Sequence, residues 1–276
     1  MRPAIMMFRI GIVGAGAIGK EIARAIDDGT VPAKLAAIWD RKVGEAEEFA
    51  ASLSQKPKVL PLDELVKECN IVVEAASQAA VREVAIAALS NSKSVMIMSV
   101  GALSDKELLE QIKALAREHH CSIYVPSGAI GGLDAVKSAS IRHVECVTIT
   151  TRKPARGLKG APFVVKNNID LDKFTVPTEI FSGPASVAIK EFPANVNVAA
   201  SLSLVGIGFE KTVVKVVVDP TITRNVHEIH VKGDFGDFHA KVENVPSATN
   251  PRTSFLAALS AIATLKQVCE PLKIGT

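Results

Sequence analysis

Short apolar runs alternate with helix-periodic segments along the first 126 residues. The first apolar run lies at residues 8–13, and apolar residues recur after it at positions 18, 22, 23 and 26. Further apolar runs occupy residues 35–39, 71–76, 94–99 and 121–125, and helical patterns separate most of them. This alternation is typical of a doubly wound parallel sheet. In such a sheet, ligands bind beside the carboxyl ends of the strands.

The pattern changes at residue 127. Runs rich in β-branched residues predict strands at 144–151, 161–165, 178–181, 212–218, 226–231 and 238–242, and helices are expected at 186–190 and 197–204. These elements predict a second α+β domain of mainly antiparallel sheet with helices on one face. The segment 158–178 is expected to form a surface hairpin.

The last apolar helix, expected at 253–268 with Thr253 or Ser254 as its cap, should pack back towards the first domain or between the two. The expected domains are therefore 1–126, 127–248 and 249–276.

The first helical pattern begins in a glycine-rich turn, Gly14-Ala15-Gly16-Ala17-Ile18-Gly19, that follows one apolar run and precedes another. In this context G-x-G-x-x-G is typical of dinucleotide binding. Gly14 permits a sharp turn, Gly16 lets the backbone approach a pyrophosphate, and Gly19 lets the helix lie close to the strand. Asp40, 21 positions after Gly19, ends the second apolar run, where a carboxylate can bind the ribose hydroxyls of NAD. The first domain is thus predicted to be a Rossmann-type doubly wound sheet.

Cations follow the acidic residue directly. Arg41 and Lys42 stand where a 2′-phosphate would lie, so the cofactor is NAD or NADP, although Asp40 favours NAD. A solvated helix start explains the two cations equally well. The residues expected to contact the cofactor in this domain are Gly14, Gly16, Ala17, Ile18, Gly19, Asp40, Arg41, Ala76, Ser77 and Gln78.

Composition narrows the class of protein. The chain has 276 residues, 48% of them hydrophobic, which is enough for two cores. The net charge of +3 is spread over 32 basic and 29 acidic residues without a basic block, so no nucleic-acid partner is expected. The four cysteines form no CxxC pair and are expected to be reduced thiols. Residues 1–7 leave no room for a signal peptide, and no apolar run is long enough for a membrane helix, so we expect a cytoplasmic protein without a membrane partner.

Seven stretches resemble the L-aspartate dehydrogenase family: GAGAIGK (14–20), EAASQAAV (74–81), SGAIGGLDA (127–135), ITTRK (149–153), FPANVNVAASLSL (192–204), NVHEIHVKGDFG (225–236) and NPRTSFLAALS (250–260). The resemblance implies oxidation of L-aspartate with NAD or NADP to iminoaspartate, which hydrolyses to oxaloacetate and ammonia. It also implies a possible link to NAD biosynthesis and a homodimer formed through the second domain. A β-branched sheet with more apolar face than its few helices can cover would favour the same dimer.

The resemblance also assigns residues in the second domain. It implies that His227 is catalytic, and that Ala129 and either Asn195 or Asn197 contact the cofactor. For His227 alone, a structural role in the core would be the commoner one. An imidazole that is neutral near pH 7 can accept a proton, so we expect the rate to rise with pH through a group that titrates near neutrality or above.

A metal site is not expected. His230 follows His227 by three residues, which places the two side chains on opposite faces if 226–231 is a strand, and no H-E-x-x-H helix occurs. The remaining histidines are expected at a helix end or on the surface.

A dicarboxylate substrate requires cations, and the sequence does not choose among its candidates. Those flanking the family stretches are Arg152, Lys153, Arg224, Lys232 and Arg252.

The same residues bear on other reaction classes. A phosphate-linked aldehyde dehydrogenase needs a thiolate at the start of the second domain, but no cysteine occurs between Cys121 and Cys146. A reductase of another small dicarboxylate fits the nucleotide domain but leaves the NVHEI stretch unexplained. A non-catalytic NAD(H)-sensing protein would bind NADH without turnover.

Overall fold

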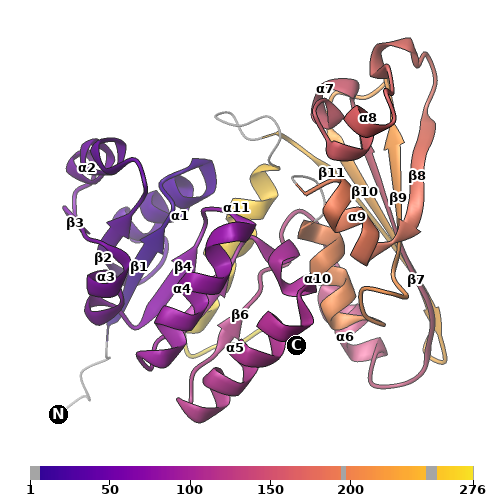
Figure 1. The fold of residues 1–276 in the computed structure, drawn as a ribbon. Coiled ribbons are helices and arrows are strands. Elements are labelled where there is room, and N and C mark those ends of the chain that lie inside the picture. Colours follow the sequence, from indigo (N-terminus) through magenta and orange to yellow (C-terminus); the bar gives the residue numbers. More distant parts are fainter. Residues whose placement is uncertain (1–6, 194–196, 247–253, 276) are drawn as a thin grey trace. The chain divides into compact units, whose positions relative to one another are not determined.

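The computed structural model describes residues 7–193, 197–246 and 254–275. The chain divides into two compact units (Figure 1). The first consists of Met1–Pro126 and Ala258–Ile274, and the second of Ser127–Ala257 and Gly275–Thr276. The boundary expected at residues 248 and 249 lies outside the described residues.

The first unit contains a six-stranded parallel sheet. Its strands are β1 (Phe8–Val13), β2 (Ala33–Trp39), β3 (Lys58–Val59), β4 (Ile71–Glu74), β5 (Ser94–Ile97) and β6 (Ile123–Tyr124). They lie in the order β3-β2-β1-β4-β5-β6, and every neighbouring pair is parallel. This is the strand order of the Rossmann fold, so the predicted fold class of the first domain is confirmed. The order reverses between β1 and β4, which is where such sheets bind their ligands.

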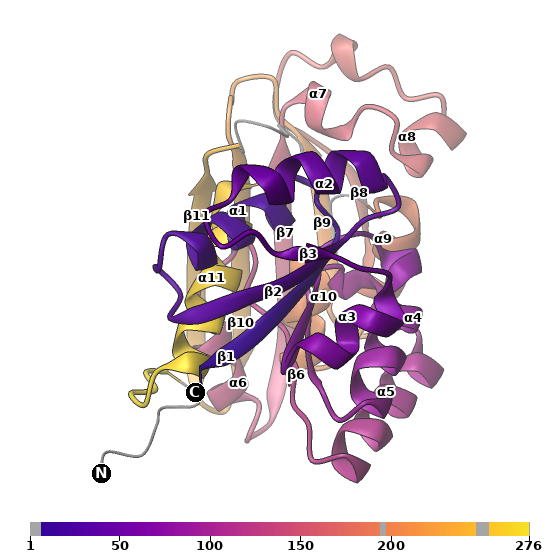
Figure 2. The same cartoon turned by 90° about the vertical axis from the view of Figure 1, so that its left-hand side faces the viewer.

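Helices cover both faces of this sheet (Figure 2). One face carries α1 (Ala17–Asp27), α2 (Val43–Ser52) and the part of α11 (Phe255–Cys269) that belongs to this unit, and the other carries α3 (Leu62–Glu68), α4 (Gln78–Ser90) and α5 (Lys106–Glu118). Ala261 and Leu265 of α11 are fully buried in the core that α1 and α2 form with the strands. Of the two residues expected to cap this last helix, Thr253 lies outside the described residues. None of the described helices is both apolar enough and long enough to span a bilayer.

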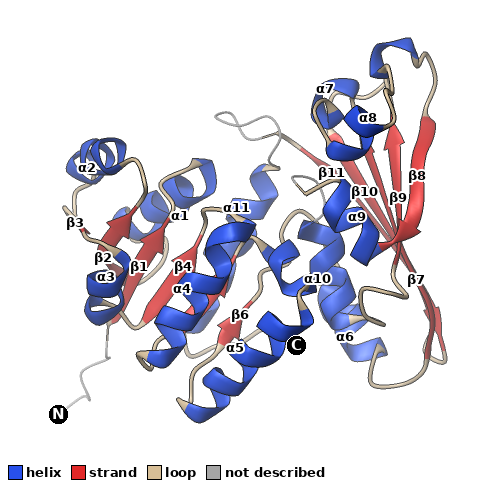
Figure 3. Ribbon diagram, viewed as in Figure 1, coloured by secondary structure: helices blue, strands red, loops and turns tan. Residues whose placement is uncertain are grey.

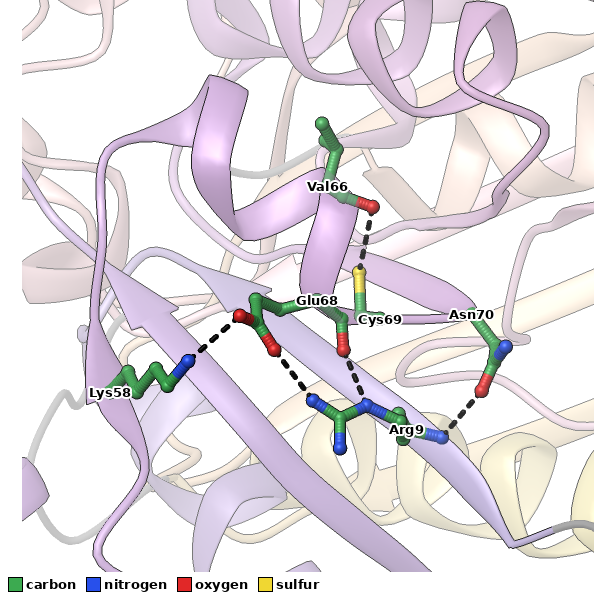
Figure 4. Close-up of polar contacts among 6 residues, drawn as sticks. All are labelled: Arg9, Lys58, Val66, Glu68, Cys69 and Asn70. Carbon is green, nitrogen blue, oxygen red and sulfur yellow. Dashed lines mark hydrogen bonds and ion pairs between the residues drawn. The ribbon is translucent and has the colours of Figure 1, made fainter.

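Polar contacts tie together the amino-terminal edge of the sheet (Figure 4). The guanidinium group of Arg9 donates to the Glu68 carbonyl at 2.6 Å and to the Glu68 carboxylate at 2.7 Å. Lys58 donates to the same carboxylate at 2.7 Å, and the Arg9 N–H donates to the Asn70 side chain at 2.9 Å. These contacts join β1, β3, the end of α3 and the start of β4. They lie at the amino-terminal edge of the sheet, whereas ligands of such sheets bind at the carboxyl-terminal edge.

The four cysteines are free thiols. Cys69 is buried and donates to the Val66 carbonyl (Figure 4). Burial raises the pKa of this thiol to about 11, so it stays protonated and unreactive at neutral pH.

The second unit contains a five-stranded mixed sheet, drawn in red in Figure 3. Its strands are β7 (Val144–Lys153), β8 (Thr178–Pro184), β9 (Val213–Val218), β10 (Asn225–Gly233) and β11 (Gly236–Asn244). They lie in the order β11-β10-β7-β9-β8, and every neighbouring pair is antiparallel except β7 and β9. The predicted α+β domain of mainly antiparallel sheet is therefore confirmed.

Helices α6 (Leu133–Ala139), α9 (Ala185–Glu191) and α10 (Asn197–Val205) lie on one face of this sheet (Figure 3). Val214 and Val216 of β9 are buried on the covered face, whereas Lys215 between them lies on the open face. The strand register places Thr148, Thr150, Glu228 and His230 on the open face as well. The open face is thus largely polar, although Val217 and Val226 also lie on it, and the expected surplus of apolar surface for a dimer is not found among its described residues.

The segment that follows β7 differs from the prediction. It forms two short helices, α7 (Ala155–Leu158) and α8 (Pro162–Lys166), and a 3-10 turn, η2 (Leu171–Lys173). The strand predicted at 161–165 and the hairpin predicted at 158–178 are both wrong. Pro162 at the first turn of α8 favours a helix start. Phe163 anchors this helix, because its ring packs against those of Phe181 and Phe192 at centroid distances of 5.4 and 5.3 Å.

Candidate active site

The glycine-rich turn joins the carboxyl ends of three strands. Gly14 follows β1 with a φ of +104°, a conformation that side chains other than glycine rarely adopt. Its N–H donates to the carbonyl of Trp39, at the end of β2, at 2.8 Å. A Cβ at Gly14 would lie 2.6 Å from the carbonyl carbon of Ala75, which follows β4. Only glycine therefore allows β1 to approach the end of β4 so closely.

Helix α1 begins directly after this turn with its first N–H groups free of a side-chain cap. Gly16 is the N-cap residue, and a Cβ built on it would meet nothing within 4 Å. A Cβ at Gly19, in contrast, would collide with the carbonyl oxygen of Gly14. Uncapped N–H groups at the positive end of a helix, next to open space, are suited to bind a phosphate.

Asp40 holds the same turn from the end of β2. Its carboxylate accepts from the Ala15 N–H at 2.7 Å and from the Lys42 N–H at 2.9 Å. Each carboxylate oxygen has a further lone pair, so hydroxyl groups of a ribose can still bind there.

A cavity of about 300 Å³ opens beside Asp40. Six of the predicted cofactor residues line it, namely Gly14, Gly16, Asp40, Arg41, Ala76 and Ser77. Four others do not. Ala17, Ile18 and Gly19 form the first turn of α1, and the side chain of Gln78 lies against Gly101 in the turn that follows β5.

Glu74 is a residue of this region that sequence reasoning missed. It ends β4, is fully buried, and accepts hydrogen bonds from the N–H groups of Ala76 (2.9 Å), Ser77 (3.0 Å) and Ser99 (3.0 Å). The Ser99 hydroxyl donates as well, at 2.9 Å. Burial raises the pKa of Glu74, and the hydrogen bonds oppose this rise. Four donors around one carboxyl group match an ionised carboxylate, which fixes the loops after β4 and β5.

In the second unit, Ala129 is 5% exposed, and its carbonyl accepts from the side chain of Asn244 at 2.9 Å. Asn197 is the first residue of α10, and Asn195 lies outside the described residues. The contacts of these residues with a cofactor remain predictions.

His227 lies on the helix-covered face of β10. It is 3% exposed, and Thr151 of β7 is its partner across the two strands. The Thr151 hydroxyl and the His227 Nδ1 form a hydrogen bond of 3.0 Å, which orients the ring. As expected for a strand, His230 lies on the opposite face of the sheet.

Two more buried polar residues accompany His227 on this face. Lys153 is 3% exposed and follows Thr151 by two residues in β7, and Asn225, 4% exposed, precedes His227 by two residues in β10. The register of the two strands brings all four side chains to the same end of the sheet. Within the described part of the chain, the Nδ2 atom of Asn225 has no hydrogen-bond partner. A buried donor of this kind is costly unless a ligand satisfies it.

The structure also chooses among the cations that were candidates for binding a dicarboxylate. Lys232 lies on the open face and pairs with Glu145 at 3.2 Å. Arg152 and Arg224 line a separate cavity of about 630 Å³ that also contains Glu228 and Glu243, whose charges oppose an anionic ligand. Arg252 lies outside the described residues. Lys153 is the described candidate that shares the face of His227.

Burial and charge shift the pKa values of this pair. Burial lowers the pKa of Lys153 to about 8. Burial and the positive charge of Lys153 lower the pKa of His227 to about 3. Without substrate, His227 is therefore neutral near pH 7, and the expected rise of the rate with pH stays a prediction. Lys153 is the group of this face that titrates near neutrality.

The strand order, the glycine turn and the cavity beside Asp40 define a dinucleotide-binding oxidoreductase of two domains. Two family models match the chain: the NAD-binding domain of homoserine dehydrogenase over residues 14–126, and the C-terminal domain of aspartate dehydrogenase over residues 134–268.

Similar proteins agree with the second model. The L-aspartate dehydrogenase of Methanocella arvoryzae is 77% identical over 98% of this chain and 100% of its own length, and that of Methanosarcina acetivorans is 53% identical over the same shares. The crystal structure of aspartate dehydrogenase from Thermotoga maritima superposes with a TM-score of 0.74 at 28% identity, over 97% of this chain and 99% of that chain. The chain belongs to the L-aspartate dehydrogenase family.

The Glu74 carboxylate gives a first test of this site. In Glu74→Gln, an amide NH₂ group replaces one carboxylate oxygen and faces N–H donors, so we expect the free energy of unfolding in urea to fall by about 1–3 kcal/mol. NAD binding, measured by calorimetry, should weaken because the 76–77 loop loses its anchor. Ser99→Ala, which removes one hydroxyl donor, serves as the milder control. Unchanged stability and NAD affinity in Glu74→Gln would contradict the anchoring role.

Proposed function

We propose that this protein oxidises L-aspartate with NAD or NADP to iminoaspartate, which hydrolyses to oxaloacetate and ammonia. The observation that carries the proposal is the buried polar group of His227, Lys153 and Asn225 in a chain of this family. Formation of NADH with L-aspartate tests it directly. Tight NADH binding without turnover would favour a non-catalytic NAD(H) sensor instead, and turnover of another small dicarboxylate alone would favour a different reductase.

The cofactor fits the first unit on structural grounds. The uncapped start of α1 would hold the pyrophosphate, and Asp40 would hold the adenosine ribose. Arg41 lines the same cavity and would neutralise a 2′-phosphate if NADP is bound. Ala129 and Asn195 or Asn197 are proposed as further contacts, from the family resemblance alone. When bound, NAD or NADP supplies the hydride acceptor.

His227 is proposed as the general base. A hydride leaves the α-carbon of an amino acid only when the nitrogen lone pair is free, so the substrate ammonium group must first lose a proton. In the tautomer whose Nδ1–H donates to the Thr151 hydroxyl, Nε2 carries the lone pair that accepts this proton. Once this proton has been released to solvent, the same atom can take a proton from the water that attacks the iminium carbon.

Lys153 is proposed to bind a substrate carboxylate, and Asn225 to donate its free N–H groups to the same substrate. This binding would also change His227. Since the charge of Lys153 is one of the two causes that lower the pKa of His227, a carboxylate placed against Lys153 would raise that pKa. Substrate binding would thereby turn a weakly basic imidazole into a better base.

We infer that the protein acts in the cytoplasm as a homodimer. The free state of all four cysteines fits a reducing compartment. The dimer rests on the family resemblance, because the open face of the second sheet is polar. Light scattering at micromolar concentration should give twice the chain mass of 29.2 kDa. A particle with the mass of a single chain would contradict the proposed dimer.

His227→Ala tests the base. Because a positioned general base contributes a factor of about 10²–10⁴ to a rate, kcat should fall by this factor. NAD affinity, measured by fluorescence titration, should stay near that of the wild type, since the glycine turn and Asp40 are intact. Thr151→Val, which removes only the hydrogen bond to Nδ1, is the matched control and should lower kcat less. Near-normal turnover of His227→Ala would move the base to another residue.

The pH dependence of kcat/KM tests the role of Lys153. This residue binds a carboxylate only while charged, so kcat/KM for aspartate should lose a factor of ten per pH unit above a pKa of about 8, relative to Lys153→Arg, which stays charged. A constant ratio of the two enzymes between pH 7 and 10 would contradict this role.

Stability provides a second readout for Lys153. The folded protein binds this proton less tightly than the unfolded chain, whose lysine has the ordinary value of 10.5, so stability should rise as pH increases from about 8 to 10.5. At pH 7 the buried charge costs up to about 3 kcal/mol, and Lys153→Met should recover part of it in urea unfolding. A loss of stability in Lys153→Met would contradict the unfavourable burial.

A further inference from the structure

The β10–β11 hairpin carries a second group of ionisable side chains, on the face of the sheet opposite to His227. His230 of β10 is the cross-strand partner of His239 in β11, and Asp237 precedes His239 by two residues. All three therefore lie on the open face of the sheet, opposite to the face that carries His227. Their side chains are between 37% and 69% exposed.

The three side chains converge on one point. The Nε2 atoms of His239 and His230 lie 2.9 and 3.1 Å from the same oxygen, Oδ1 of Asp237. The two imidazole rings are stacked, with their centroids 4.1 Å apart and their planes 9° from parallel. One ligand atom from each residue lies within 4.8 Å of the other two.

Hydrogen bonding alone explains this group only in part. It accounts for the two ring nitrogens at one oxygen of Asp237 but not for the stacking of the two rings. A divalent ion, in contrast, binds neutral imidazoles and uses both rings at once. Two histidine nitrogens and one carboxylate oxygen form a donor set typical of zinc, and bonds of about 2 Å to one ion place such ligand atoms somewhat more than 3 Å apart. The two nitrogen–oxygen separations of 2.9 and 3.1 Å are slightly shorter than this value, and because the rings are stacked, one of them must turn for both nitrogens to face one ion.

We propose that His230, Asp237 and His239 form a surface site for a divalent transition-metal ion such as Zn²⁺, with water at the remaining position. Lys232, the cross-strand partner of Asp237, pairs with Glu145 at 3.2 Å, so its charge is already balanced. The ion would cross-link the two strands of the hairpin and stabilise the second unit. In the sequence, the residue that could join His230 at a metal is His227, which a strand places on the opposite face. The partners of His230 come instead from the next strand, β11.

The test uses the full chain after dialysis against a chelator. Zn²⁺ is titrated by calorimetry, and Co²⁺ by its visible absorption. We expect one ion to bind per chain, and its binding to raise the Tm. His239→Ala removes an exposed ligand without disturbing the core, and should lose both the binding and the Tm shift. His143→Ala, which removes another exposed histidine of this unit, is the matched control and should keep both.

Two further variants sharpen the result. Asp237→Asn keeps the size of the side chain but removes its charge, and should weaken the binding. Cys146→Ser removes a thiol from the same face and should leave the binding and the Co²⁺ spectrum unchanged. The proposal is overturned if the wild type binds no ion, or if His239→Ala binds it as the wild type does.

Discussion

The close approach of β1 to the end of β4 is the constraint on which the first unit depends. A side chain at Gly14 would overlap the backbone at Ala75, so the parallel pairing of these two strands continues to its end only with glycine there. The N–H of the same glycine donates to the carbonyl of Trp39 at the end of β2. The Glu74 carboxylate accepts hydrogen bonds from the loops after β4 and β5. These contacts fix the ends of four strands at the point where the strand order reverses, and the cavity beside Asp40 forms there.

The second unit contributes its chemistry by placing polar groups where an apolar core would be more stable. Lys153 and Asn225 are almost fully buried on the same face as His227. A buried ammonium group and a buried amide nitrogen without a partner among the described residues reduce stability. A dicarboxylate amino acid carries groups that could bind both side chains. The electrostatic coupling between Lys153 and His227 then connects the binding of the substrate with the basicity of the imidazole.

Strand β10 presents different chemistry on its two faces, because its side chains alternate between them. Residues 225, 227 and 229 of β10 face the helices, whereas residues 228 and 230 face the open side. His227 is consequently dry and its pKa is strongly lowered, while His230 lies with His239 and Asp237 at the surface. Identical side chains three residues apart thus differ in chemistry only because of the face on which they lie.

The sequence by itself determined the elements whose signals are local. The glycine turn, Asp40 and the alternating apolar runs specify a dinucleotide-binding sheet, because each depends on residues close together in the chain. The motif around His227 identified the family in the same way. Tertiary structure alone decided which cation joins His227, because five candidates look alike in sequence and only the β7–β10 register buries Lys153 beside it. It also turned 161–165 into a helix through Pro162 and the phenylalanine cluster, and it brought His239 to His230. Even Glu74, a lone charge at the end of an apolar strand, showed its role only when donors from two separate loops met it, since pairing between distant segments leaves no local pattern.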